Sequence, residues 1–443
     1  MSLTEGKLPQ NSSKHSPAKP AAKRVLIVTY YWPPSGGGGV QRWLKFAKLL
    51  PGLGWEPVIV TPSNPDVPVQ DVSLLEDVAE GLEIWSYPVW EPTRLLSAVG
   101  IGGSSTSRLG ADQAKSYSMK NRMLNWVRGN FFVPDARVGW VDPTSRKVLK
   151  KLRTNPVDLI VTTGPPHSMH LIGLALKQAT GLPWVADFRD PWSTMDYLEE
   201  FNLSEKAKKR MKTLERKVVD AADRLVVTSP GALSELGVPN SPKGAVLPNG
   251  WDRDDFPSPV PPPYPQNNPP VIGHFGALYG SRNPRNLWPA LARIGWSLRI
   301  GGQVTPEVKK DILRSGVRVE WLGDLGHKEA VLAMHECHAL LVTHNDSASA
   351  RSSTPGKLFE CLATGRPLLV IGPKDGDLEA RCHALGLSYL PHQTPEKDIS
   401  SWLQQLDSDS PANTVSKELA AIFERRVIAT ELADMFNALL PNS

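Results

Sequence analysis

The sequence is poor in cysteine and has no long apolar run, and each absence excludes a class of protein. Its three cysteines, Cys337, Cys361 and Cys382, contain no Cys-x-x-Cys pair and cannot all pair with one another. A disulfide framework is therefore not indicated, and a reducing cytosol is the simplest setting. No stretch of about 18 apolar residues occurs, and residues 1–19 lack the apolar core of a signal peptide. We therefore expect a cytoplasmic protein.

The chain also carries little excess charge. Among its 443 residues, 50 Lys and Arg stand against 45 Asp and Glu, so the formal net charge is +5. This surplus is too small to indicate a nucleic-acid-binding protein, although it suits anionic small substrates or an anionic lipid surface. A chain of this length can form two ordinary domains with complete cores.

Short apolar runs alternate with stretches of helical periodicity along most of the chain. This alternation predicts the α/β class, with parallel, doubly wound sheets. The expected strands are residues 25–30, 56–61, 159–163, 184–188, 224–228, 271–275, 298–301, 317–321, 339–343 and 368–371.

Two stretches of biased composition divide the chain. Residues 1–23 are rich in Ser, Lys and Pro, which predicts a disordered tail. Proline occupies eight of the 14 positions in residues 257–270, which favours a stiff, extended connector. We therefore expect a first domain over residues 24–256 and a second one that begins at residue 271.

The most informative stretch of the second domain is STPGKLFECLATGRP, residues 353–367. Thr354 is expected to cap a short helix, and Pro355 fits its first position. Gly365 is expected to end that helix. A helix that begins in this way offers free N–H groups and the positive end of its dipole to an anion.

Three residues at the start of this helix suit a nucleoside diphosphate. Gly356 has no side chain, so that a phosphate can approach the backbone closely. Lys357 adds a positive charge in the first turn, and Glu360 shares its helix face three residues later. The cation is expected to meet the pyrophosphate and the carboxylate the ribose hydroxyls. The alternative is a capped surface helix with solvated charges.

This segment resembles the donor-binding signature of the GT-B glycosyltransferases, most closely the large retaining family 4 (glycosyl transferase group 1). The resemblance implies two Rossmann-like domains that face a cleft, with a donor domain at residues 271–416 and a final helix, residues 417–440, that crosses back to the first domain. Members usually carry two glutamates eight residues apart. Glu360 matches the second, which contacts the donor ribose. The first, which touches the donor sugar, falls at Ser352 here, so the sugar contacts depart from the family pattern.

Two further loops resemble the same family. Four glycines, residues 36–39, follow the first expected strand, but their spacing is not that of a dinucleotide-binding loop. The resemblance implies that their backbone amides, at Gly37 and Gly38 in particular, face the donor diphosphate. It also implies that Gly276 and Arg282, after the first strand of the second domain, contact the donor phosphates, which a guanidinium suits well.

The first domain offers candidates for the acceptor side. Many family members carry a histidine near the end of the strand at residues 184–188, and Asp187 is its nearest counterpart, with Asp190 as the alternative. A carboxylate there can orient an acceptor hydroxyl and accept its proton. It can equally be a structural partner for Arg189. His167 is a candidate for the acceptor pocket, and the alternative for it is a histidine of the core.

Residues 118–132 are expected to form a basic amphipathic helix. Met123 and Trp126 fall on one stripe, with three basic side chains nearby, Lys120, Arg122 and Arg128. Such a helix either lies in a membrane interface or packs against its own domain. The sequence therefore allows a peripheral membrane contact at the inner face of the membrane.

No metal site is expected. His335 and His338 can share a helix face, but no second cluster completes a ligand set. The two D-x-D segments, residues 252–254 and 375–377, lie away from the donor motif.

The sequence as a whole thus predicts a glycosyltransferase that uses a UDP- or GDP-linked sugar, with retention of configuration as the family implies, and a glycan or lipid-linked acceptor. No other cofactor is expected. Two alternatives stay open, a nucleotide-sugar epimerase and a non-catalytic nucleotide-sugar-binding subunit.

Overall fold

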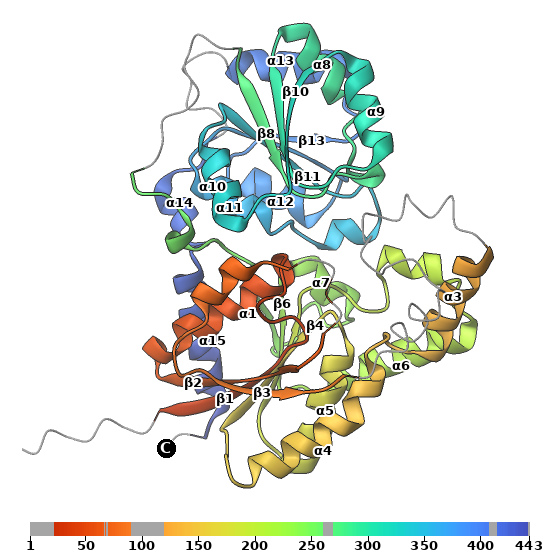
Figure 1. The fold of residues 1–443 in the computed structure, drawn as a ribbon, viewed down its shortest axis with the longest axis vertical. Helices are drawn as coiled ribbons and strands as arrows, with labels where there is room; N and C mark the ends of the chain where they lie inside the picture. Colours follow the sequence, from red (N-terminus) through yellow and green to blue (C-terminus); the bar gives the residue numbers. More distant parts are fainter. Residues whose placement is uncertain are drawn as a thin grey trace, which may run out of the picture.

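The computed structural model describes residues 22–65, 67, 70–89, 119–259, 269–406 and 414–441. Within these residues the chain forms two α/β domains, which lie one above the other in Figure 1. Every strand pairing between the named strands is parallel, which confirms the predicted fold class. The predicted tail and most of the proline-rich connector lie outside the described residues.

The first domain is built on a sheet with the strand order β3-β2-β1-β4-β5-β6-β7. Its strands are β1 (Lys23–Val28), β2 (Trp55–Pro62), β3 (Glu83–Tyr87), β4 (Leu159–Gly164), β5 (Trp184–Phe188), β6 (Arg224–Val227) and β7 (Gly244–Val246). Both faces of this sheet are buried, because Leu26 and Val28 of β1 enter one apolar core and Val25 and Ile27 enter the other.

Helices cover both faces of the first sheet, and short 3₁₀ turns occur in the connections between elements. The helices are α1 (Gly38–Leu49), α3 (Met119–Phe131), α4 (Val141–Leu152), α5 (Ser168–Thr180), α6 (Glu205–Ala221) and α7 (Pro230–Glu235). Three of these turns are η2 (Val72–Asp77), η5 (Asp196–Phe201) and η6 (Arg253–Asp255). No described helix has the length and apolar character that crossing a membrane requires.

The second domain has the strand order β10-β9-β8-β11-β12-β13. Its strands are β8 (Val271–Phe275), β9 (Ser297–Gly301), β10 (Arg318–Gly323), β11 (Ala339–Thr343), β12 (Leu368–Gly372) and β13 (Tyr389–Pro391). Its helices are α8 (Leu287–Ile294), α9 (Pro306–Ser315), α10 (His327–His335), α11 (Lys357–Ala363), α12 (Asp377–Ala384) and α13 (Glu396–Leu406).

The chain returns to the first domain through two helices, where the sequence predicts one. α14 (Lys417–Ala421) packs against α11 of the second domain, and α15 (Arg425–Leu439) packs against α1 of the first. Between them the backbone extends alongside Trp251. The N–H of Trp251 donates to the carbonyl of Phe423 (3.0 Å), and the N–H of Arg425 donates to the carbonyl of Trp251 (2.8 Å). A continuous helix cannot make this pairing, so the helix breaks where the chain crosses between domains.

Candidate active site

Arg282 lies after β8, at the end of the 3₁₀ turn Gly280–Arg282, and it is held in place from two sides. Its Nε donates to Oδ1 of Asn345 (2.6 Å), and its guanidinium lies over the ring of Tyr279, 4.8 Å from the centroid. The Tyr279 hydroxyl donates to the same Asn345 oxygen (3.2 Å). Among the described residues the hydrogen bond to Asn345 uses only Nε, so the two Nη groups are left for a ligand. The sequence signal for Asn345 is its place just after strand β11, where parallel sheets put ligand contacts.

His274 lies near both Arg282 and Lys357. It is buried in β8, and its Nδ1 lies 3.1 Å from the carbonyl oxygen of Leu341, which only accepts, so Nδ1 carries the proton. Burial lowers the pKa of His274 to about 4, and nearby Arg282 and Lys357 contribute to this shift. The neutral ring therefore turns the lone pair of Nε2 towards Gly276, where no side chain intervenes. The prediction missed His274, although a polar residue inside a buried strand is a signal.

The donor segment begins differently from the predicted helix start. α11 begins at Lys357, and the residue before it, Gly356, has no capping side chain. Thr354 is not the cap, because its hydroxyl oxygen lies 3.3 Å from that of Ser229 in the first domain. Gly356 packs closely on another first-domain residue, since a Cβ at this position would lie 3.2 Å from Nδ2 of Asn249. Contact with the first domain thus shapes the segment.

Lys357 and Glu360 form an ion pair with an Nζ–Oε2 distance of 2.8 Å. The carboxylate is buried, whereas about a third of the lysine side chain (33%) is exposed. Burial alone would raise the pKa of Glu360, but Lys357, His327 and Arg425 outweigh it and lower that pKa. Glu360 therefore stays ionised at neutral pH and remains able to accept hydrogen bonds.

The glycine loop starts α1 and lies against Arg189. Gly37 precedes the helix with a φ of 94°, which favours glycine, and Gly38 is its first residue. A Cβ at Gly39 would lie 2.4 Å from Nη1 of Arg189, so only glycine lets this guanidinium approach the first turn. Arg189 is also anchored on the backbone, because its Nε donates to the carbonyl of Gly164 (3.2 Å).

Asp187 is the centre of a buried network rather than a group that faces the second domain. Its carboxylate accepts from Nε (3.2 Å) and Nη2 (3.0 Å) of Arg42, from Nε1 of Trp43 (2.6 Å) and from the hydroxyl of Thr163 (2.9 Å). The side chain has 0% exposure. A carboxylate with four donors and no access to solvent cannot take a proton from an acceptor. These contacts contradict the prediction of a catalytic Asp187.

Asp190, the alternative, lies three residues further on and is only partly buried. Burial raises its pKa, and Asp187 adds to this, whereas Arg189 and Arg282 oppose it. The effect of Arg282 is informative, because that residue belongs to the second domain. Asp190 is therefore a first-domain carboxylate close to the proposed phosphate contact.

His167 is buried inside the first domain, with 3% exposure. Its ring stacks on Trp192 at a centroid distance of 5.2 Å, and burial lowers its pKa to about 4. This position fits the alternative reading, a histidine of the core, better than a residue lining an open acceptor pocket.

Contacts between the domains hold the segment before α11 and also the start of α12. The hydroxyl of Ser352, expected at the donor sugar, donates instead to Glu235 of α7. Nearby, Oδ2 of Asp377 accepts from the hydroxyl of Ser229 and from the N–H of Gly231, both at 2.6 Å. One D-x-D segment thus serves as a contact between the domains.

Two other candidates for metal ligation, Asp252 and His338, have structural partners. Asp252 pairs with Nζ of Lys45 (3.0 Å), and Nδ1 of His338 accepts from the N–H of Val271 (3.0 Å). Among the residues that the structure describes, no group of His, Cys, Asp and Glu is arranged to hold a metal ion.

Comparison with known proteins agrees with this architecture. Residues 37–250 match the family model of the glycosyl transferase 4-like domain, whereas no curated protein matches the chain. Anabaena HepE, solved with UDP and glucose, superposes with a TM-score of 0.60 at 15% identity, over 94% of this chain and 99% of that one. The lipopolysaccharide outer core galactosyltransferase WaaB gives 0.57 at 13% identity, over 94% and 100%. A putative UDP-N-acetylglucosamine 2-epimerase from Listeria monocytogenes gives 0.50 at 14% identity, over 96% and 99%. The likeness confirms the predicted GT-B fold.

Proposed function

We propose, from the match of residues 37–250 to the glycosyl transferase 4-like domain and from the GT-B fold, that the protein transfers a sugar from a nucleotide-diphosphate sugar to an acceptor hydroxyl. One observation carries the proposal. Arg282 and Lys357 come from separate segments of the second domain, and both act on the neutral ring of His274. Two cations thus lie near one buried imidazole, and together they supply the positive charge that a diphosphate site requires.

The proposed chemistry is the stabilisation of a departing nucleoside diphosphate. This group leaves with roughly two to three negative charges. Arg282 and Lys357 offset two of them, and the first turn of α1, with Gly37 and Gly38, adds about half a charge through its dipole. Glu360 is proposed to accept hydrogen bonds from the ribose hydroxyls of a UDP- or GDP-linked donor.

Asp190 is proposed to have the role that the sequence predicted for Asp187. In this proposal Asp190 orients the acceptor hydroxyl and receives its proton, while the sugar moves with retention of configuration. Burial raises the pKa of Asp190 towards neutral pH, which suits a group that exchanges a proton. Arg189 holds this loop against the start of α1.

Transfer should proceed without a divalent ion. We expect a panel of UDP- and GDP-sugars, incubated with glycan and lipid-linked acceptors in excess EDTA, to give a glycosylated product at the rate seen without EDTA. The physical reason is that the two cations and the α1 amides nearly match the charge of the leaving group. Product analysis by mass spectrometry measures this.

Three outcomes would contradict parts of the proposal. Loss of activity in EDTA, with recovery on addition of Mg²⁺ or Mn²⁺, would show that a metal is needed. An altered donor sugar formed without any acceptor would favour the epimerase alternative. Nucleotide-sugar binding without transfer or hydrolysis would favour the binding subunit.

We further propose that α3 and α6 form a surface that binds an anionic membrane, and that the acceptor is reached there. These helices pack together at one side of the first domain (Figure 1). On α3 the large apolar side chains of Met123, Trp126 and Phe131 are exposed. Beside them, α6 carries seven basic and three acidic residues in its 17 positions. Apolar side chains next to a dense positive charge suit the headgroup region of an anionic bilayer.

Salt should weaken this membrane contact. We expect the protein to sediment with vesicles of phosphatidylglycerol and phosphatidylcholine at low salt, but not with pure phosphatidylcholine, since each basic residue contributes about 1 kcal/mol near an anionic surface. Changing Lys208, Lys209 and Lys212 to Gln should abolish sedimentation. The matched control removes three exposed charges at or beside α4, at Arg146, Lys150 and Arg153. Equal losses in both variants, or binding that salt does not change, would argue against this surface.

A further inference from the structure

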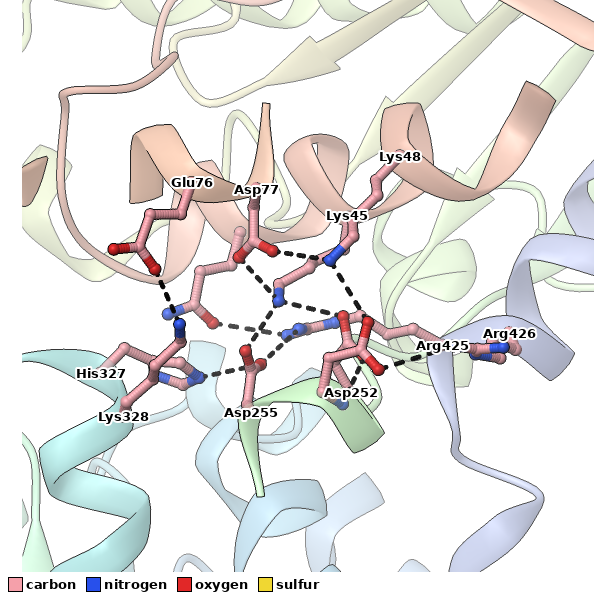
Figure 2. Close-up of polar contacts among 12 residues, drawn as sticks. Lys45, Lys48, Glu76, Asp77, Asp252, Asp255, His327, Lys328, Arg425 and Arg426 are labelled. Carbon is pink, nitrogen blue, oxygen red and sulfur yellow. Dashed lines mark hydrogen bonds and ion pairs between the residues drawn. The ribbon is translucent and has the colours of Figure 1, made fainter. Parts of the chain in front are cut away.

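Asp255 is a buried carboxylate at the point where the chain crosses between the domains. Figure 2 shows side chains from three segments converging on it. Its Oδ1 lies 2.7 Å from Nζ of Lys45, and its Oδ2 lies 3.2 Å from Nε2 of His327 and 3.7 Å from Nη1 of Arg425. Lys45 belongs to α1, His327 begins α10, and Arg425 begins α15. One carboxylate therefore connects the first domain, the second domain and the returning chain.

The charges of this cluster are strongly held. Lys45 also pairs with Asp77 (2.8 Å) and Asp252 (3.0 Å), and its side chain is only 1% exposed. Burial alone would lower its pKa, but Asp255, Asp77 and Asp252 together raise it. Burial would raise the pKa of Asp255, but His327 and Lys45 lower it. Both groups thus stay ionised across the neutral pH range. The ion pairs of the cluster therefore hold the two domains together at this point throughout that range.

His327 extends this cluster into the proposed donor site. The same Nε2 that faces Asp255 also lies 3.6 Å from Oε1 of Glu360. Both partners are ionised carboxylates, which only accept, so Nε2 carries a proton. It lies within hydrogen-bond distance of Asp255 and faces Glu360 at a longer, electrostatic distance. Glu360 pairs in turn with Lys357. A line of contacts therefore runs from α1 through Asp255 and His327 to α11.

A second contact links the same crossing to the start of α11. Nε of Arg425 donates to the carbonyl of Asn249 (3.2 Å), and the side chain of Asn249 packs against Gly356. The position of α11 thus depends on the crossing at two places.

We propose that His327 is a positioning residue: from the point where the chain crosses between the domains it sets the orientation of Glu360. It thereby governs recognition of the nucleotide ribose. The proposal rests on the proposed function, in which Glu360 accepts hydrogen bonds from the ribose. α1 carries the glycine loop at one end and Lys45 further along. The line of contacts therefore fixes the position of the glycine loop, which meets the phosphates, relative to Glu360, which meets the ribose. Without His327, the Glu360 carboxylate keeps its charge but turns towards Lys357 alone.

The test is nucleotide binding by the full-length chain, measured by calorimetry with UDP, or with GDP where the parent prefers it. We expect His327→Ala to weaken binding about tenfold, the scale of losing a hydrogen bond to a charged group. His327→Gln keeps an N–H donor and should restore most of the affinity. Lys328→Ala is the matched control. Lys328 neighbours His327 and also reaches the first domain, at Glu76, but both side chains of that pair are exposed, so binding should stay within about twofold.

The 2′-deoxy nucleotide separates positioning from a general structural effect. In the parent we expect the 2′-deoxy form to bind about tenfold more weakly than the ribonucleotide, and in His327→Ala this ratio should fall towards one. A loose or partly unfolded site would weaken both ligands equally and leave the ratio unchanged, which would overturn the proposal. Should His327→Ala not fold, His327→Asn is measured in the same way.

A double-mutant cycle distinguishes failure of this proposal from failure of the proposed function. In a Glu360→Ala background, His327→Ala should have no further effect on affinity. If Glu360→Ala binds both nucleotides as the parent does, the ribose contact itself is wrong. If Glu360→Ala weakens binding while His327→Ala does not, or if the two effects simply add, the function stands and the positioning role of His327 is wrong.

Discussion

Replacing Lys357 with alanine is expected to lower the rate of sugar transfer by about 10²–10³, the scale of losing one electrostatic contact to a transition state. The departing diphosphate gains negative charge, and Lys357 is one of the two second-domain cations proposed to meet it. Its pKa is raised from the ordinary value of 10.5, because Glu360 outweighs the effect of burial, so the lysine is fully charged in any neutral assay. Turnover at saturating donor is the quantity to measure.

A second variant separates the lost charge from its effect on Glu360. Removing Lys357 leaves a buried carboxylate without its nearest cation, which by itself lowers stability. In Lys357→Ala/Glu360→Gln that carboxylate is neutral, so the melting temperature should recover while turnover stays low. Lys374, an exposed lysine of the same domain, is the control and should tolerate alanine. Activity of Lys357→Ala within threefold of the parent would remove the residue from the site.

Replacing Asp187 with alanine is expected to lower the free energy of unfolding by about 3–5 kcal/mol, the cost of removing one partner from a buried ion pair. Arg42 is only 1% exposed and would lose its counter-charge, and Trp43 and Thr163 would lose the acceptor for their hydrogen bonds. Chemical denaturation with a fitted midpoint and slope measures this change.

Asp190→Asn is the informative contrast to that variant. Because burial raises the pKa of Asp190, the ionised form is the one that the fold disfavours, and a neutral amide should leave stability unchanged or slightly higher. Turnover should fall by about 10²–10⁴ if the carboxyl exchanges a proton with the acceptor. The reverse pattern, a stable but inactive Asp187→Asn beside an active Asp190→Asn, would return the catalytic role to Asp187.

The sequence by itself determined the architecture. Strands such as β5 and β8 are buried on both faces, so their residues are mostly apolar, with Asp187 and His274 as the exceptions. The predicted bounds of both strands match those of the structure. Their regular alternation with helical stretches implies parallel sheets. Arg282 was predicted as a phosphate contact from the family resemblance and Lys357 from the local helix motif, and both roles stay predictions.

Only the tertiary structure decided which side chains meet. Asp187 and Asp190 are the same residue type and lie three residues apart. Asp187 pairs with Arg42, some 145 positions away in the chain, whereas Asp190 lies near Arg282. Thr354 is a good helix cap by local rules, but Ser229 of the other domain lies against its hydroxyl. The break between α14 and α15 depends on Trp251, and the link from Lys45 to Glu360 joins four segments. Local pattern records the backbone preference of neighbouring residues, whereas the partner of a buried charge is chosen by packing between segments that are far apart in the chain.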